Sequence, residues 1–271
     1  MSTPTVSFQG ERGAYSEEAA TMFFGSAVTK ACRTFKEVFQ SVEEKSAEYG
    51  IAPAENSLEG SINQTYDLLL ETPLKICGEV KVRVRHCLLT LPGTRLEDLK
   101  VVYSHPQALA QCAGFLEKLG LETIPTYDTA GSAKMLIEKQ LKAGAIASER
   151  AAEIYGLEVL RKGIEDFPEN FTRFFVLAKI DAPPTGKDRT SIVFATTHTP
   201  GSLHSALGEL ASRQINLTKI ESRPIRGTPW EYNFFVDFDG HQKDATVSQA
   251  INALRNSTAM LKILGSYPRA D

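Results

Sequence analysis

The sequence predicts an α/β protein that ends in a separate ferredoxin-like module. From Thr5 to about Ala178, short apolar strands alternate with helical stretches, an order typical of largely parallel sheets with helices on both faces. Beyond a Pro/Gly-rich linker the order becomes βαββαβ, which is the order of a ferredoxin-like module. With 271 residues, the chain is long enough for two or three compact units.

The elements before the linker follow from apolar runs and from helix-capping residues. We expect strands at Thr5 to Gln9, Tyr49 to Ala54, Lys100 to Ser104 and Glu122 to Pro125, and helices at Glu17 to Phe24, Gly60 to Glu71, Pro106 to Leu119 and Asp128 to Leu141. Each polar turn before a helix, taken alone, is typical of an ordinary cap. Four such turns in one α/β unit favour a binding site for a small anion.

The segment EVKVRVRHCLL, from Glu79 to Leu89, interrupts this alternation. Valine alternates with lysine and arginine along it, which predicts a strand with one solvated face. We interpret it as a positively charged sheet edge, with a substrate-steering surface as the alternative. Its position between two α/β halves also suits a strand that crosses from one lobe to another.

The segment PENFTRFFVLA, from Pro168 to Ala178, predicts a strand because aromatic and β-branched residues dominate it. Thr172 and Phe174 share one face of a regular strand, and Arg173 lies on the other. Arg173 therefore either clamps a carboxylate through a local twist or braces the strand by a bidentate ion pair. The sequence leaves both roles open.

The segment Asp181 to Asp188 contains two prolines and a glycine, and we interpret it as an interdomain linker. After it we expect strands at Thr190 to Thr197, Ile215 to Glu221, Tyr232 to Phe238 and Ala259 to Tyr267, and helices at Gly201 to Arg213 and Asp244 to Arg255. The predicted division is an α/β region at 1–180, a linker at 181–188 and a ferredoxin-like module at 189–271.

Composition and motifs exclude several classes of function. The net charge of -3 without a strongly basic region argues against nucleic-acid binding, and no apolar run is long enough for a membrane span. The N-terminus lacks an export signal, so we expect a cytoplasmic protein with reduced cysteines. The histidines lack metal-ligand spacing, and the GxxG turn at Gly10 to Gly13 is not a nucleotide motif, so neither a metal nor a cofactor is expected.

Seven segments, in order, closely resemble one known family. They are GERGAYSEEAA, PAENSLEGSINQTYDLL, VYSHPQALAQC, DTAGSA, NFTRF, PGSLHSAL and IESRP, and they span about Gly10 to about Gly240. This pattern is similar to that of prephenate dehydratase fused to an ACT regulatory domain.

The resemblance implies two α/β lobes, the second at about 81–160, that resemble a type II periplasmic binding protein with the active site in the cleft. It implies conversion of prephenate to phenylpyruvate on the phenylalanine pathway, without a cofactor. Thr172 is implied as the catalytic residue, acting as hydrogen-bond donor to the leaving hydroxyl. The implied substrate-binding residues are Glu55, Asn56, Ser57, Ser104, His105, Gln111, Thr129, Arg173 and Phe174.

For the C-terminal module the resemblance implies feedback regulation by L-phenylalanine bound at a dimer interface, within a homodimer or homotetramer. The implied effector-binding residues are Pro200, Gly201, Ser202, Leu203, Asn216, Leu217, Glu221, Ser222 and Arg223. Ser202 and His204 replace the alanine and valine of the common Gly-Ala-Leu-Val form, which affects the expected effector affinity and choice. A module that only dimerises is the alternative.

Two further alternatives concern the activity. The same chemistry on arogenate is a close rival, because no residue decides between the keto and the amino substrate. A non-catalytic sensor of small anions that retains the two-lobed cleft is the rival from another class.

Overall fold

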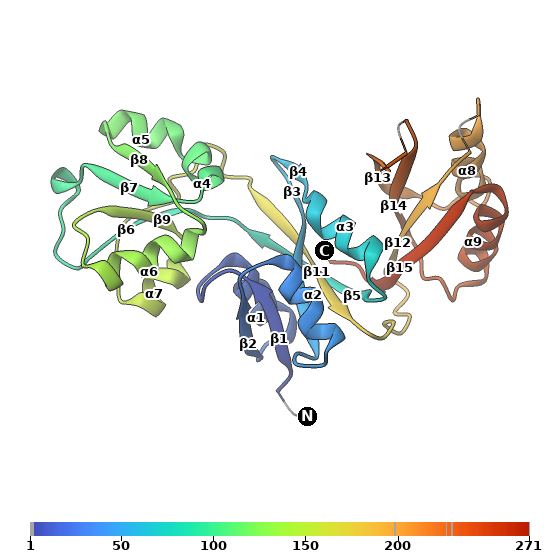
Figure 1. Ribbon diagram of the computed structural model, residues 1–271, viewed down its shortest axis with the longest axis horizontal. Coiled ribbons are helices and arrows are strands. Elements are labelled where there is room, and N and C mark those ends of the chain that lie inside the picture. The colour runs from blue at the N-terminus through green and yellow to red at the C-terminus, as the bar shows by residue number, and fades with distance from the viewer. Residues whose placement is uncertain (1–2, 198, 226, 229, 271) are drawn as a thin grey trace. The chain divides into compact units, whose positions relative to one another are not determined.

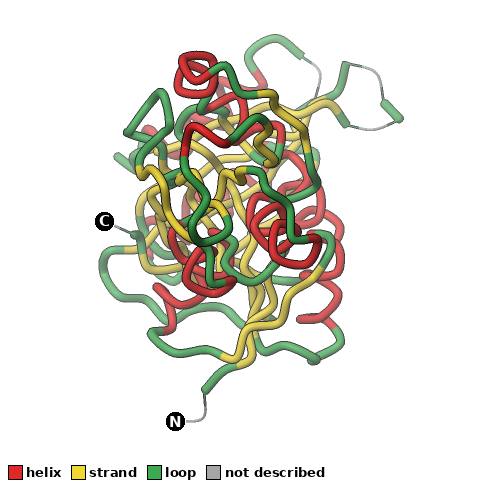
Figure 2. The backbone as a smooth tube through the Cα atoms, turned by 90° about the vertical axis from the view of Figure 1, so that its left-hand side faces the viewer, coloured by secondary structure: helices red, strands yellow, loops and turns green. Residues whose placement is uncertain are grey.

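The computed structural model describes residues 3–197, 199–225, 227–228 and 230–270. The described residues form two compact units. The first unit extends to Thr65 and includes Val80–Phe174, and the second combines Tyr66–Glu79 with the residues from Phe175 onward. Both helices and strands occur throughout the described chain, and Figure 2 colours them red and yellow.

The first unit is built on two sheets. In the first sheet the strand order is β2-β1-β3-β11-β5, with the short strand β4 paired to β3, and β1 runs parallel to both of its neighbours. The strands are β1 (Thr5–Gln9), β2 (Val28–Cys32), β3 (Tyr49–Asn56), β4 (Gly60–Ser61), β5 (Lys75–Arg83) and β11 (Phe171–Ala178), and the accompanying helices are α1 (Tyr15–Phe24), α2 (Phe35–Glu43) and α3 (Asn63–Glu71). α3, β5 and β11 contribute residues to both units.

The second sheet of the first unit has the order β10-β6-β9-β7-β8. Its strands are β6 (Cys87–Thr90), β7 (Val101–Ser104), β8 (Glu122–Pro125), β9 (Gly144–Ala147) and β10 (Glu158–Lys162). Helices α4 (Pro106–Gln111) and α5 (Ala113–Leu119) cover one face, and α6 (Thr129–Lys139) and α7 (Glu149–Tyr155) cover the other (Figure 1). A short 3-10 helix (Leu96–Asp98) precedes β7. Leu88, Val102 and Ile146 are fully buried in the core between this sheet and its helices.

The second unit contains an antiparallel sheet of order β13-β14-β12-β15. Its strands are β12 (Asp188–Ala195), β13 (Leu217–Pro224), β14 (Tyr232–Asp239) and β15 (Met260–Pro268), and its helices are α8 (Ser202–Ala211) and α9 (Ala245–Ser257). Both helices lie on one face of the sheet, over a core that includes Ile192, Phe194 and Phe238 (Figure 1). The predicted βαββαβ order is confirmed.

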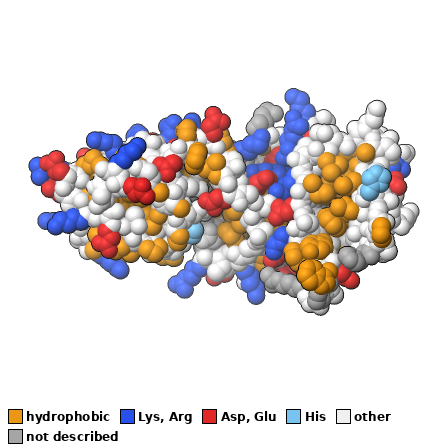
Figure 3. Space-filling view, turned by 90° about the horizontal axis from the view of Figure 1, so that it is seen from above, with side chains coloured by type: hydrophobic (Ala, Val, Ile, Leu, Met, Phe, Trp, Pro, Cys, Tyr) orange, Lys and Arg blue, Asp and Glu red, His pale blue; other side chains and the backbone are white. Residues whose placement is uncertain are grey.

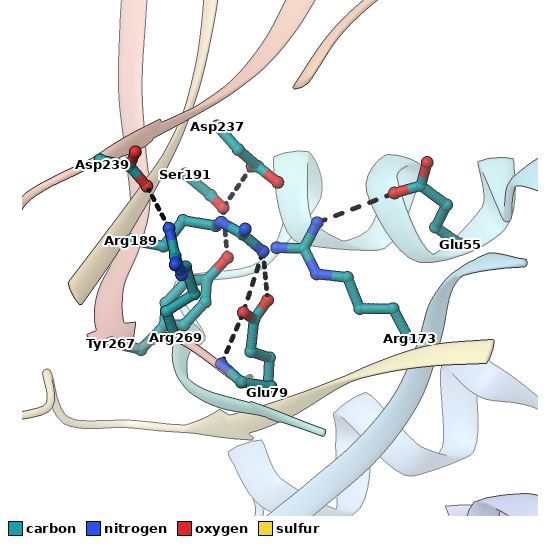
Figure 4. Close-up of polar contacts among 10 residues, drawn as sticks. Glu55, Glu79, Arg173, Arg189, Ser191, Asp237, Asp239, Tyr267 and Arg269 are labelled. Carbon is teal, nitrogen blue, oxygen red and sulfur yellow. Dashed lines mark hydrogen bonds and ion pairs between the residues drawn. The ribbon is translucent and has the colours of Figure 1, made fainter. Parts of the chain in front are cut away.

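A buried polar cluster joins the two stretches of the second unit (Figure 4). Arg189 of β12 donates to both carboxylate oxygens of Glu79 at 2.9 Å, and the backbone N–H of Ala270 donates to the same carboxylate at 2.9 Å. The Glu79 side chain is fully buried. Because a buried carboxylate needs such partners, these bonds tie β5 to β12 and to the end of the chain.

Two predicted elements are interrupted in the structure. The strand expected from Glu79 to Leu89 breaks between β5 and β6, because the His86 backbone N–H turns toward the Glu165 carboxylate at 2.9 Å. The helix expected from Pro106 to Leu119 divides at Cys112, whose ψ of 14° departs from helical geometry. Because of the first break, His86 lies in the connection directly before β6.

Candidate active site

A cavity of about 340 Å³ lies in the first unit, where β3, β11 and four helices converge. It is lined by Gln9, Ala14, Tyr15, Ser16, Phe35, Pro53, Asn56, Ile62, Val84, His86, His105, Gln107, Ala108, Gln111, Tyr127, Asp128, Thr129, Thr172 and Phe174. Six of the residues singled out in the sequence line it, namely Asn56, His105, Gln111, Thr129, Thr172 and Phe174. Sequence reasoning did not select the lining residues Tyr15, His86, Gln107, Tyr127 and Asp128.

Thr172 lies near the start of β11 and is nearly buried. Its Oγ1 accepts a hydrogen bond of 3.0 Å from Asn56 Nδ2, which comes from the end of β3. Thr172 and Phe174 both line the cavity, as strand alternation predicts, and Arg173 does not. The hydroxyl is therefore the polar group that β11 presents to the cavity.

Gln111, at the last residue of α4, connects several elements at the cavity wall. Its Oε1 lies 2.9 Å from His86 Nε2 and 3.0 Å from Asn170 Nδ2, and its Nε2 donates to Glu59 at 2.8 Å. Burial lowers the pKa of His86, and the bond with Gln111 offsets this only in part. The lowered pKa favours the neutral form of His86.

Helix N-termini, rather than cationic side chains, border this cavity. Among the described residues that line it, none is a lysine or an arginine. α1 begins at Tyr15 after Ala14, which gives the first-turn amides no side-chain cap, and Ala14, Tyr15 and Ser16 line the cavity. Such amides, with the helix dipole, bind small anions without a cationic side chain.

α6 begins at the same cavity but carries its own cap. The Asp128 carboxylate accepts from Gly131 N at 2.7 Å, and Thr129 of the first turn lines the cavity. Burial raises the pKa of Asp128, and the hydrogen bond from Gly131 opposes that rise.

Four residues expected at the site lie outside the cavity lining. Ser104 is fully buried and donates to Ile146 O at 2.7 Å, which ties β7 to β9. The Ser57 hydroxyl accepts from Phe171 N at 2.9 Å and holds the start of β11. Arg173 Nη1 lies 3.8 Å from Glu55 Oε2 (Figure 4), a contact that fits a role in bracing the strand.

The second unit contains a cavity of about 360 Å³ beside the start of α8. Pro200, Ser202 and Leu203 line it, and Gly201 adopts a φ of 82° that favours glycine. Trp230 and Tyr232 also line it and were not anticipated.

Five of the other expected effector residues do not line this cavity. Asn216 donates to Asp239 at 3.0 Å, Glu221 pairs with Lys219 at 3.3 Å, and Arg223 pairs with Asp67 of α3 at 3.2 Å. Leu217 is half-buried and Ser222 is exposed. Of the two motifs, PGSLHSAL contributes residues to the lining of this cavity and IESRP does not.

Other classes of site find no support in the described part of the chain. It contains no group of three histidine, cysteine, aspartate or glutamate residues placed to hold a metal. Its helices are all too short or too polar to cross a membrane. Basic and acidic side chains are interspersed on the face shown in Figure 3.

Comparisons with known proteins agree with these features. The family model described as prephenate dehydratase matches residues 6–182, and the model of the ACT domain matches residues 190–256. A bifunctional chorismate mutase/prephenate dehydratase of Aquifex aeolicus is 44% identical, over 98% of this chain and 74% of its own. An arogenate dehydratase/prephenate dehydratase of Arabidopsis thaliana is 47% identical, over 97% of this chain and 72% of its own.

Two solved structures resemble the whole chain. A prephenate dehydratase from Arthrobacter aurescens in complex with L-Phe has a TM-score of 0.90 and 32% identity, covering 98% of this chain and 90% of that chain. A protein described as the quorum-quenching acylase GqqA has a TM-score of 0.90 and 37% identity, covering 98% of each chain. The predicted fold class is therefore confirmed.

Proposed function

Because the chain belongs to the prephenate dehydratase family and carries an ACT domain, we propose that it converts prephenate to phenylpyruvate by joint loss of carbon dioxide and water. The observation that carries this proposal is the Thr172 hydroxyl, which faces the cavity while its oxygen accepts a bond from Asn56. A hydroxyl held in this way keeps its own proton available for a leaving group.

The chemistry sets three requirements. Prephenate carries two carboxylates and a ring hydroxyl, and loss of one carboxylate with the hydroxyl forms an aromatic ring, so the reaction itself needs no electron acceptor. The enzyme must hold both carboxylates, donate a hydrogen bond to the departing hydroxyl, and keep bulk water away from the ring.

Each requirement has candidate residues. We assign the hydroxyl of Thr172 to the departing oxygen and the ring of Phe174 to the wall beside the substrate ring. The N-terminus of α1, which has no side-chain cap, suits one carboxylate, and Thr129, His105 and Gln111 suit the other. The lowered pKa of His86, which burial causes, disfavours a positive charge on this side chain.

The test is an assay of the purified protein with prephenate and, separately, with arogenate. Formation of phenylpyruvate with a higher kcat/KM for prephenate supports the proposal. A preference for arogenate would make the chain an arogenate dehydratase, which the names of its plant relatives also suggest. Binding of prephenate without turnover of either substrate would favour the sensor.

We further propose that L-phenylalanine regulates the enzyme through the ACT domain. The Arthrobacter structure holds L-Phe, and Pro200, Ser202 and Leu203 line a cavity here. The proposed division is catalysis in 1–180, a linker at 181–188 and regulation in 189–271, within a cytoplasmic homodimer or homotetramer. Light scattering with and without phenylalanine tests the assembly.

A further inference from the structure

A hydrogen-bonded chain of four side chains links Thr172 to the far wall of the cavity, and the direction of each bond can be determined. Asn56 Oδ1 accepts from the backbone N–H of Leu58 at 3.0 Å and of Glu59 at 3.2 Å. Backbone N–H groups only donate, so the orientation of the Asn56 amide is fixed. Its Nδ2 must therefore face Asn170 Oδ1 at 2.7 Å and Thr172 Oγ1 at 3.0 Å, with the Phe171 carbonyl oxygen as a more distant acceptor at 3.3 Å.

The same reasoning fixes the next two side chains. Because Asn170 Oδ1 accepts from Asn56, Asn170 Nδ2 donates to Gln111 Oε1 at 3.0 Å. The opposite end of Gln111 donates to the Glu59 carboxylate at 2.8 Å, and a carboxylate only accepts. Gln111 Oε1 is thus an acceptor for His86 as well, at 2.9 Å, which places the histidine proton on Nε2.

This polarity has a consequence for Thr172. Its oxygen is occupied as an acceptor by Asn56, and among the described residues its hydroxyl has no second hydrogen-bond partner. The proton therefore points away from Asn56, toward the cavity that Thr172 lines. A reversed Asn56 amide would instead accept the proton and withdraw it from the cavity.

We propose, resting on the proposed function, that Asn170 is a positioning residue of the reaction. Asn170 is fully buried and is not among the residues that line the cavity, so it does not touch the substrate. Asn170 Oδ1 takes one hydrogen of Asn56 Nδ2, which leaves the other for Thr172 Oγ1, and the orientation of Asn170 is itself held by Gln111. In this way Asn170 keeps the Thr172 proton directed at the substrate.

The decisive variant is Asn170→Asp, because the introduced carboxylate accepts from Asn56 but presents a second acceptor to Gln111 Oε1. At about pH 8 we expect kcat to fall by roughly 10- to 100-fold, with KM within about threefold of wild type. The reason is that the disturbed network weakens the hydrogen bond from Thr172 to the departing oxygen, and this bond acts in the transition state. A protonated carboxyl donates to Gln111 and restores the pattern. Burial raises a carboxyl pKa, so the ratio of variant to wild-type kcat should rise at least about fivefold toward about pH 5.5.

The titratable groups that face the network are His86, Tyr15, Glu59 and Glu165. They are the same in both proteins, so the ratio of kcat values cancels their effect. Asn252→Asp, at an exposed position on α9, is the matched control for the added charge and should give a ratio near one at every pH. A ratio for Asn170→Asp that does not change with pH, or a loss confined to KM, would overturn the proposal.

A second experiment keeps the proposal testable if Asn170→Asp does not fold. Gln111→Glu keeps an acceptor for Asn170 and His86 but sets two carboxylates against each other at Glu59, which is exposed. Adding Glu59→Gln supplies a donor again, and we expect kcat of the double variant to exceed that of Gln111→Glu at least about fivefold. If the effects of Gln111→Glu and Glu59→Gln on the logarithm of kcat were strictly additive, the positioning role would be contradicted. An inactive wild type would instead refute the proposed function, so the two failures are distinguishable.

Discussion

At the scale of single residues, the acidity of Thr172 is the central problem of the proposed reaction. A free threonine hydroxyl is a poor acid, so it acts by donating a hydrogen bond rather than by releasing its proton outright. The bond that its oxygen accepts from Asn56 Nδ2 at 3.0 Å polarises the hydroxyl and strengthens it as a donor. The departing oxygen of the substrate, and not an acceptor of the protein, then receives this hydrogen bond.

Thr172→Val removes the hydroxyl with little change of shape and separates this role from packing. We expect the barrier to rise by about 2 to 4 kcal/mol, the effect of losing one donor to a developing oxyanion, with little change in substrate binding. Thr172→Ser retains the donor and should stay within about tenfold of wild type. Steady-state kinetics with prephenate measure both, and a Val variant as active as the Ser variant would reduce Thr172 to a strand residue.

The residues of the site differ in how far the sequence reveals them. Thr172, Asn56 and Gln111 stand in motifs that match a family and can be read directly. Asn170 lies 114 positions from its partner Asn56, and only the pairing of β3 with β11 brings the two together. A proline followed two residues later by an asparagine is typical of a turn, so the local sequence does not indicate this role. His86 was considered only as a metal ligand, because no local pattern marks a neutral buried histidine.

At the scale of elements, the linker ends in a turn built around one carboxylate. Asp188, at the first residue of β12, accepts from Thr185 N, Thr185 Oγ1 and Gly186 N at 2.8, 2.7 and 2.9 Å. Burial by itself raises the pKa of Asp188, but these hydrogen bonds outweigh it and hold the pKa below its ordinary value. The turn is therefore stabilised by the ionised carboxylate.

The sign of the pH dependence follows from that lowered pKa. The stabilisation is complete above the unfolded pKa of about 4 and is lost as the pH falls through the folded value. Asp188→Asn, which loses one of the accepting oxygens, should lower the free energy of unfolding by about 1 to 2 kcal/mol near pH 7. Denaturation by urea at several pH values should show this difference shrinking below about pH 4, and a difference independent of pH would contradict it.

The N-terminal turn of α1 depends on a close approach to α7. A Cβ added at Gly13 would lie 2.8 Å from the Cα of Ala151, and Gly13 has a φ of 87°. Gly25, at the other end of α1, has a similar φ of 70° but nothing within 4 Å of an added Cβ.

The pair Gly13→Ala and Gly25→Ala therefore separates crowding from backbone strain. Both variants should lose about 1 kcal/mol from the unfavourable φ, and Gly13→Ala should lose a further 1 to 3 kcal/mol, about the usual penalty of overpacking. Urea denaturation measures both, and equal losses would show that α7 yields to the added methyl group.

Elements with a clear pattern were predicted better than elements without one. β1 and β8 have the predicted bounds, because apolar runs and turn residues define them. β2 was missed, since VTKAC is mostly exposed and shows no alternation. α2 was missed although Val38, Phe39 and Val42 mark a buried helical face, so a closer count of its periodicity would have found it.

At the scale of the whole molecule, the second unit is assembled from two separate stretches of the chain. Tyr66 contacts Phe235 with ring centroids 5.0 Å apart, and Phe175 contacts Tyr267 at 6.2 Å. Lys262 of β15 donates to the carbonyl of Leu69 at 2.8 Å, near the end of α3. Residues 66–79 are thus as much part of this unit as β12 to β15.

Phenylalanine regulation is therefore best tested by substitution. Ending the chain at Ala182 would remove the partners of Tyr66 and Phe175 and should destabilise what remains. A truncated protein that phenylalanine does not inhibit would therefore not show where phenylalanine binds. Leu203→Glu places a charge in the second cavity and should raise the phenylalanine concentration for half-inhibition by at least about tenfold, the effect of about 1.4 kcal/mol. Inhibition assays measure this, and an unchanged half-inhibition would remove this cavity from the effector site.

The composition of the second unit also limits how the gene can recombine. Gly265 of β15 passes so close to β5 that an added Cβ would lie 2.1 Å from the carbonyl oxygen of Ile76. A crossover at the linker would import a foreign β15 without the β5 that it fits. We expect functional chimaeras to inherit residues 66–79 together with the residues from Phe175 onward. These two stretches, distant in the sequence, should therefore evolve together as one structural unit.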